Sequence, residues 1–224
     1  VRRMSSDWVD AKIIAVSDCD SSHVAIDIEV KEPICFSNTN IPYDIYYLIP
    51  DPIHKDRFIQ RTYTALLENN NNRIIHTIIY RHRNFGKAYH WLNDLAMNQH
   101  VSIKLGRPSI KAETLNAGSL VFLGDDTSVY AIKKIVEYAS RKHNCTVFVE
   151  TVENIDYSIG FKTSKYFSIQ RESEGVLSLI KGKKDLFSGD VAVWAANEVA
   201  TIVKIRKYLS GKEIFCAELH GYWS

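Results

Sequence analysis

Short runs of alternating apolar and polar residues dominate the first half of the chain. The alternation is typical of half-buried strands, because successive side chains of a strand point to opposite faces. β-Branched and aromatic residues are frequent in these runs, and turn-forming residues separate them. Strands are predicted at residues 8–16, 23–30, 46–49, 56–64 and 73–80, with a hairpin tip at the asparagine run 69–72. Short strands at this spacing predict a small antiparallel β-barrel.

The pattern changes between residues 109 and 118. An apolar run at 119–123 leads through a turn at 124–127 into helical spacing over 129–138. Strand patterns recur at 146–150 and 191–194, and a second long helical pattern covers 198–209. Buried strands that alternate with helices predict a parallel sheet, whose ligands bind beyond the carboxyl ends of the strands. We therefore expect an N-terminal antiparallel barrel over residues 1–112 and a C-terminal Rossmann-like parallel α/β domain over 113–224.

Composition narrows the class of protein. Of the 224 residues, 46% are hydrophobic and 24% are charged, which is typical of a globular chain rather than a disordered one. The net charge of +2 indicates no general attraction to nucleic acid. No apolar run approaches the roughly 18 residues that a membrane-spanning helix needs, and the first residues lack the apolar core of a signal peptide. We expect a cytoplasmic protein without stable membrane insertion and, because its four cysteines and eight histidines are scattered, without a protein metal site.

A candidate ligand site begins with the string Arg61-Thr62-Tyr63-Thr64 in a predicted strand. Residues two apart share a face of a strand, so Arg61 and Tyr63 can reach one ligand while the Thr64 side chain points away. A guanidinium suits phosphate oxygens, and a tyrosine ring suits a flat heterocycle. Gly86 opens an amphipathic segment, where free backbone N–H groups would attract a pyrophosphate. The alternative is an ordinary strand, because tyrosine and threonine favour strands without any ligand.

Five short strings, taken in order, resemble the siderophore-interacting proteins, which are ferric-siderophore reductases of the ferredoxin-reductase-like superfamily. That family's R-x-Y-[ST] is followed by a strand ending in His and by G-P-A-S-x-W-A. Its later strings are G-D-E-T-A-x-P-A, W-x-A-G-E and a closing G-Y-W. In this chain the matching positions are Arg61–Thr64, His82 with Gly86–Trp91, Gly124–Ala131, Trp194–Glu198 and Gly221–Trp223.

The resemblance implies a noncovalent FAD and an electron donor, either NAD(P)H or a ferredoxin. The substrate would be a ferric siderophore, whose iron is released as Fe(II). The protein then needs no catalytic side chain or metal ligand of its own, because the flavin carries the electrons. The positions implied to bind the cofactor are Arg61, Tyr63, Thr64, His82, Gly86, Lys87, Ala88, Trp91, Asp125, Thr127 and Glu198.

Ferric siderophores are often anionic, so a basic surface would help to capture them. Lys183, Lys184, Lys204 and Lys207 are the candidates, although lysines on an amphipathic helix are commonly just its solvated face. We expect the protein to be a monomer.

Four departures from the family pattern bear on ligand binding. Leu66 stands where the family often has arginine, Lys87 and Tyr130 replace prolines, and Asn197 replaces the glycine of A-G-E. A side chain at Asn197 would obstruct the close approach of a nicotinamide. Two alternatives therefore remain open: a noncatalytic siderophore-binding protein, and a general NAD(P)H:flavin-type reductase that acts on other acceptors.

Overall fold

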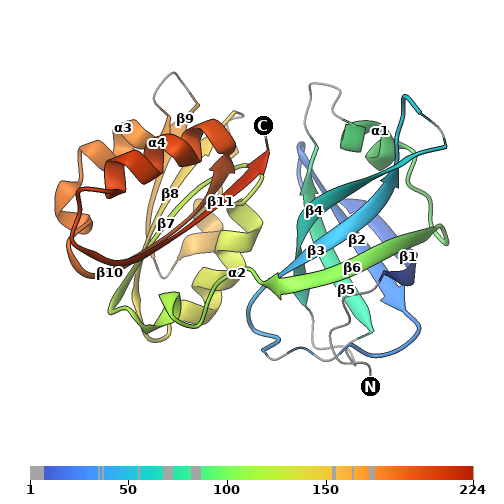
Figure 1. Ribbon diagram of the computed structural model, residues 1–224, viewed down its shortest axis with the longest axis horizontal. Coiled ribbons are helices and arrows are strands. Elements are labelled where there is room, and N and C mark those ends of the chain that lie inside the picture. The colour runs from blue at the N-terminus through green and yellow to red at the C-terminus, as the bar shows by residue number, and fades with distance from the viewer. Residues whose placement is uncertain are drawn as a thin grey trace. The chain divides into compact units, whose positions relative to one another are not determined.

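The computed structural model describes residues 8–34, 36, 38–54, 56–67, 73–81, 87–152, 155–162, 164–171 and 175–223. The chain divides into two compact units, Val1–Ser109 and Ile110–Ser224, called here the barrel unit and the α/β unit (Figure 1). The predicted hairpin tip at 69–72 lies outside the described residues.

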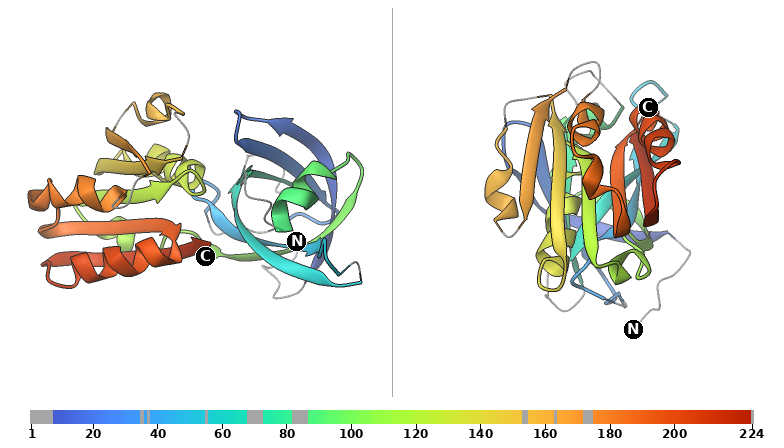
Figure 2. Two further views of the ribbon diagram at one scale, coloured as in Figure 1. Left: turned by 90° about the horizontal axis from the view of Figure 1, so that it is seen from above. Right: turned by 90° about the vertical axis from the view of Figure 1, so that its left-hand side faces the viewer.

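Six antiparallel strands of the barrel unit close into a barrel with the order β1-β2-β5-β4-β3-β6. The short helix α1 lies over one end of this barrel, as the view from above shows (Figure 2). The elements are β1 (Val9–Asp18), β2 (His23–Val30), β3 (Tyr43–Pro50), β4 (Phe58–Leu67), β5 (Ile74–Tyr80), α1 (Lys87–Asn93) and β6 (His100–Pro108).

Strand β3 shows why these residues form a barrel. Tyr43, Ile45, Tyr47 and Ile49 are fully buried, and the residues between them are at least partly exposed. A strand with one apolar face must turn that face inward, which closure of the sheet achieves without leaving an edge.

Pairing around strand β4 is uneven. β4 pairs with β3 continuously from Phe58 to Ala65. Its described pairs with β5 are only Ala65–Thr77, Leu66–His76 and Leu67–Ile75. Residues 58–64 of β4 therefore have no ladder partner among the described residues of β5.

The α/β unit contains a five-stranded, wholly parallel sheet with the order β11-β10-β7-β8-β9. From the central strand β7 the chain builds outward to one side and then crosses over to the other side. The carboxyl ends of β7 and β10 thus flank a topological switch point, where ligands of such sheets bind. The strands are β7 (Ser119–Asp125), β8 (Asn144–Thr151), β9 (Lys165–Gln170), β10 (Gly189–Glu198) and β11 (Ile214–Trp223).

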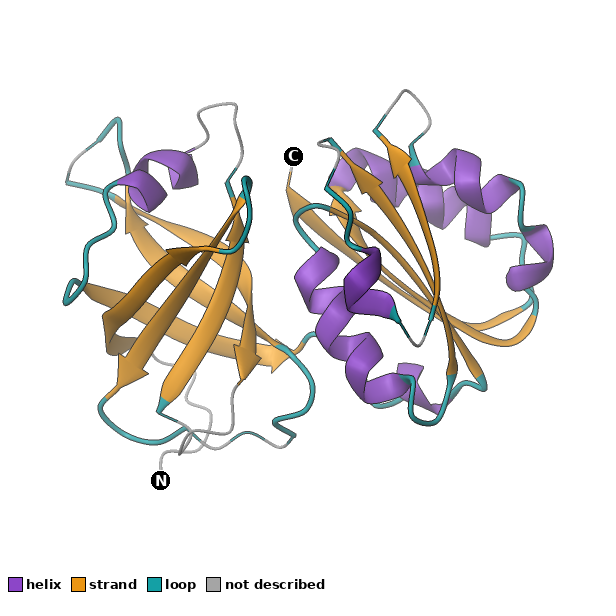
Figure 3. Cartoon of the chain, turned by 180° about the vertical axis from the view of Figure 1, so that it is seen from behind, coloured by secondary structure: helices purple, strands orange, loops and turns teal. Residues whose placement is uncertain are grey.

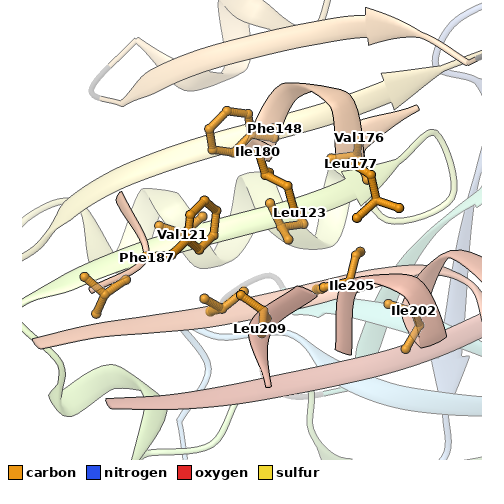
Figure 4. Packing of buried hydrophobic residues seen from close by; sticks show 13 residues of the cluster. Val121, Leu123, Phe148, Val176, Leu177, Ile180, Phe187, Ile202, Ile205 and Leu209 are labelled. Atoms are coloured by element: carbon orange, nitrogen blue, oxygen red, sulfur yellow. The ribbon is translucent and has the colours of Figure 1, made fainter. Parts of the chain in front are cut away.

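Helices lie on both faces of this sheet (Figure 3). One face packs against α3 and α4 through a cluster of thirteen buried apolar side chains, among them Leu123, Phe148, Ile180 and Ile205 (Figure 4). On the other face, a Cβ at Gly124 would collide with Ile132 of α2, so helix and strand are in direct contact there. The helical elements are η1 (Thr114–Asn116), α2 (Val129–Ala139), η2 (Ser158–Phe161), α3 (Val176–Lys181), η3 (Lys184–Leu186) and α4 (Val199–Leu209).

The predicted fold class is confirmed: an antiparallel barrel precedes a Rossmann-like parallel α/β unit. In the described part of the chain, no helix combines the length and the apolar character needed to cross a membrane.

Candidate functional site

Arg61 and Tyr63 lie on the same face of β4. They stand opposite Tyr47 and Ile45 in the β3 ladder, and directly opposed residues of an antiparallel pair share a face. Whereas Tyr47 and Ile45 are fully buried, Arg61 and Tyr63 are only half-buried. They occupy the stretch of β4 that does not pair with β5. Thr64, on the opposite face, is buried.

Three aromatic rings from different elements meet beside this stretch. The ring of Tyr47 contacts those of Tyr63 and Trp91, with centroids 5.8 Å and 5.5 Å apart. The Tyr47 hydroxyl is hydrogen-bonded to Thr77 Oγ1 at 3.0 Å. We call Tyr47, Tyr63 and Trp91 the barrel aromatic cluster.

Two polar atoms of the barrel aromatic cluster are buried without a hydrogen-bond partner among the described residues: Tyr63 Oη and Trp91 Nε1. Burial raises the pKa of the Tyr63 hydroxyl well above its usual range, and the nearby Arg61 charge opposes this effect. A buried polar group without a partner is costly, so such atoms are exceptions that call for an explanation. A polar ligand is one explanation.

The Arg61 guanidinium has few partners among the described residues of the barrel unit. Its Nη1 donates to the backbone oxygen of Gln60 at 3.1 Å, and it forms no ion pair with a described residue. An arginine with unused donors beside an open strand suits a phosphate ligand.

Helix α1 contributes Lys87, Ala88 and Trp91. The Lys87 ammonium is engaged by the Asp51 carboxylate at 2.9 Å. This hydrogen bond, with further ones from the backbone N–H groups of Ile53 and His54, lowers the pKa of Asp51 to about 2. Lys87 could therefore meet a phosphate only by leaving Asp51. Ala88 is half-buried in the helix, and the predicted positions His82 and Gly86 lie outside the described residues.

In the α/β unit, the carboxyl edge of the sheet carries a network of buried polar side chains. Asp125 ends β7, Glu150 lies near the end of β8, Arg171 follows β9, and Asn197 lies near the end of β10. Arg171 joins the two carboxylates, with 3.0 Å from Nη2 to Asp125 Oδ2 and 3.1 Å from Nε to Glu150 Oε1. Asn197 Nδ2 donates to the same Glu150 oxygen at 3.1 Å. We call these four residues the edge network.

The other predicted positions of this edge, Thr127 and Glu198, form hydrogen bonds to residues one or two positions away in the sequence. Both the N–H and the hydroxyl of Thr127 donate to Asp125 Oδ1. Glu198 caps α4, and its N–H donates to Asn197 Oδ1 at 2.6 Å. The motif comparison identified Asp125 and flagged Asn197, but it missed Glu150 and Arg171. Only their positions at the ends of neighbouring parallel strands could have indicated them.

The four predicted lysines lie on segments that pack together. Lys204 and Lys207 are exposed on α4, whereas Lys183 and Lys184 follow α3. The two segments are joined by a hydrogen bond from the Tyr208 hydroxyl to the Ile180 carbonyl at 3.1 Å. Lys183 makes a cation–π contact, because its ammonium lies 4.2 Å from the centroid of the Phe167 ring.

The barrel unit also carries a hollow of about 300 Å³. It is lined by side chains of both charges, Asp10, Lys12, Glu29, Lys31, Arg73 and His100. None of them belongs to the predicted site.

Comparison with solved structures supports the assignment of the fold. The siderophore-interacting protein of Acinetobacter baumannii matches with a TM-score of 0.76 at 19% identity, covering 97% of this chain and 90% of that one. A siderophore utilization protein from T. fusca matches with 0.73 at 19% identity, covering 98% and 94%. The ferredoxin-NADP+ reductase of Plasmodium falciparum, solved with 2′P-AMP, matches with 0.67 at 10% identity, covering 92% of each chain. At these identities the likeness shows a shared fold.

The sequence itself gives a more specific result. Residues 117–224 match the profile of the siderophore-interacting protein family, and no curated protein matches the chain. The predicted recognition is therefore confirmed: residues 117–224 match the siderophore-interacting protein family, and over its whole length the chain has the ferredoxin-reductase-like fold.

Proposed function

We propose that this protein is a cytoplasmic, FAD-dependent ferric-siderophore reductase, which reduces siderophore-bound Fe(III) and releases it as Fe(II). The observation that carries the proposal is the stretch of β4 that has no ladder partner among the described residues of β5. There Arg61 and Tyr63 share one face. Two polar atoms of the barrel aromatic cluster, Tyr63 Oη and Trp91 Nε1, are buried without partners among the described residues.

The residues of this stretch fit FAD. The Arg61 guanidinium has free donors for phosphate, and the hydroxyl of Tyr63 and the N–H of Trp91 can meet the polar groups of a flat heterocycle. Thr64 and its neighbours offer backbone groups on the edge that β5 leaves unpaired. His82, Gly86 and Lys87 remain predicted neighbours of the pyrophosphate. Asp125, Thr127 and Glu198 remain predicted positions of the α/β unit.

Each part of the site would have a distinct task. A bound FAD would supply the electron-transfer chemistry. Arg61 would neutralise phosphate, and Tyr63 and Trp91 would orient the ring and keep water from it. Tyr47 would hold both rings in place through its own bond to Thr77.

The iron arrives and leaves as part of the substrate. Fe(II) is less charged and softer than Fe(III), so hard oxygen donors hold it less tightly and one electron promotes release. Lys204 and Lys207, with Lys183 and Lys184 nearby, would attract an anionic ferric siderophore.

A noncatalytic siderophore-binding protein is the second candidate. It is favoured by Leu66, which offers no charge to phosphate where the family often has arginine. In a general flavin reductase, the third candidate, the siderophore would be one acceptor among many.

An anaerobic iron-release assay separates the three candidates. The FAD-loaded protein is reduced by light with a deazaflavin, and Fe(II) is trapped from several ferric siderophores and from ferric citrate. The proposal predicts Fe(II) release in proportion to the flavin oxidised, with a preference for one siderophore class. A siderophore-binding protein would bind the chelates without oxidation of flavin, and a general reductase would show no preference.

A further inference from the structure

The edge network occupies the place where a nicotinamide dinucleotide would bind. In open parallel sheets, the pyrophosphate lies beyond the carboxyl ends of the strands at the switch point. In this chain the ends of β7 and β10 carry Asp125 and Asn197, both fully buried. From the next strand, the 3%-exposed Glu150 accepts hydrogen bonds from both Arg171 and Asn197.

Three backbone amides of this edge are also already used. A pyrophosphate is held mainly by free N–H groups of turns and helix starts. In this edge the N–H of Val176 donates to Glu150 Oε2 at 2.8 Å, and that of Thr127 donates to Asp125 Oδ1 at 2.9 Å. The N–H of Glu198 donates to Asn197 Oδ1. The chain's own side-chain oxygens thus take three of the donors that phosphate oxygens could use.

The charges at this edge also disfavour binding of a dinucleotide. Asp125, Asp126 and Glu150 place three carboxyl groups at this edge, and Arg171 is the guanidinium that joins two of them. Asp126 is fixed as well, because it accepts the Val152 N–H at 2.8 Å and the Tyr157 hydroxyl at 2.9 Å. Counting the described residues, a dinucleotide phosphate would meet more negative than positive charge, at short range in a poorly solvated place.

We infer that the carboxyl edge of the α/β unit does not accept a nicotinamide dinucleotide, and that Glu150 and Asn197 are the residues that exclude it. Under the proposed function, on which this reading of the donor rests, the flavin is reduced by a donor that does not dock NAD(P)H at this edge. The residues of the edge do not fit the cofactor that the fold suggests.

Calorimetric titration of the whole chain with NADH, NADPH and ADP-ribose tests the inference without relying on turnover. The wild type is expected to show no saturable binding up to about 1 mM, the upper end of common enzyme–substrate affinities. The double variant Glu150→Gln/Asn197→Gly removes one carboxylate charge from the edge and frees the Glu198 N–H that Asn197 Oδ1 accepts. It is expected to bind NADPH or ADP-ribose at least about tenfold more tightly than the wild type.

The control is Asp10→Asn, which changes the net charge as Glu150→Gln does but lies on the barrel unit. It should leave dinucleotide binding unchanged. If the double variant unfolds, Asn197→Gly alone replaces it. Saturable binding by the wild type would overturn the inference, and so would an opened variant that folds but gains no affinity. FAD titration of the same samples keeps the two proposals apart, because loss of FAD binding bears only on the barrel unit.

Discussion

Two tyrosines of the barrel aromatic cluster differ in one respect. Tyr47 has its hydroxyl bonded to Thr77 at 3.0 Å, whereas the hydroxyl of Tyr63 is buried without a partner among the described residues. A satisfied buried hydroxyl stabilises the fold, and an unsatisfied one opposes it. The pair therefore distinguishes a hydroxyl that stabilises the fold from one that our proposal assigns to ligand binding.

Replacing each tyrosine with phenylalanine tests this distinction. Tyr47→Phe should lower the free energy of unfolding of the FAD-free protein by about 1–2 kcal/mol, because it leaves Thr77 buried and unpaired. Tyr63→Phe should leave it unchanged or raise it. FAD affinity should fall about three- to tenfold for Tyr63→Phe, the loss of one hydrogen bond. Urea unfolding and FAD titration measure the two effects, and equal destabilisation by both variants would contradict the assignment.

The ion pair between Asp51 and Lys87 gives a prediction in pH. The pKa of Asp51 is lowered from 3.8 to about 2, chiefly by the Lys87 hydrogen bond. The pair therefore stabilises the fold above pH 3.8, and this stabilisation is lost as the pH falls through about 2. In the Asp51→Asn variant, the thermal unfolding midpoint should therefore decrease less than in the wild type as the pH falls from 3.8 to about 2. Asp18→Asn, which removes an exposed ion pair with Arg81, should leave that fall nearly as in the wild type.

At the scale of elements, the start of α3 depends on a glycine. Gly175 caps this helix with φ +46°, and a Cβ there would collide with the Glu150 carboxylate. Gly175→Ala should therefore lower the free energy of unfolding by about 2 kcal/mol or more, through backbone strain and disruption of the edge network. Gly211→Ala is the control, since nothing lies within 4 Å of its added Cβ and its φ is not positive. Similar urea midpoints for the two variants would contradict this account.

Patterns of apolar residues predicted the elements that have one clearly buried face. Strands β1 to β5 and helices α2 and α4 appear within a few residues of their predicted bounds, because the period of burial is plain in the sequence. Strands β6, β9 and β11 and helix α3 were not predicted. β9 and β11 are edge strands with mixed exposure, and α3 has only six residues, so none of these three elements gives a strong periodic signal. β6 alternates Val101, Ile103 and Leu105 and could have been recognised.

The candidate site was predictable only in part. The string around Arg61 and Tyr63 indicated a shared face, which the β3–β4 register shows. The ring of Tyr47, the orphaned N–H of Trp91 and the bridge through Arg171 depend on contacts between residues distant in sequence. A local motif cannot show such contacts.

At the scale of the whole molecule, the lysines of α4 predict salt-dependent capture of substrate. Lys204→Glu/Lys207→Glu should raise the KM for an anionic ferric siderophore several-fold, with little change in kcat, and the effect should shrink at high salt. The control is Arg141→Glu/Lys142→Glu, which makes the same charge change after α2. An equal rise in KM for the control would show that only net charge matters.

The account depends most directly on FAD binding by the barrel unit. Titration of the FAD-free protein with FAD, followed by flavin absorbance and fluorescence, tests it with Arg61→Met as the matched variant. The wild type should bind one FAD per chain, and Arg61→Met should bind it about 10- to 100-fold more weakly, as expected for a lost charge-assisted contact to phosphate. A wild type that takes up no FAD, or an Arg61→Met variant that binds it equally well, would contradict the account.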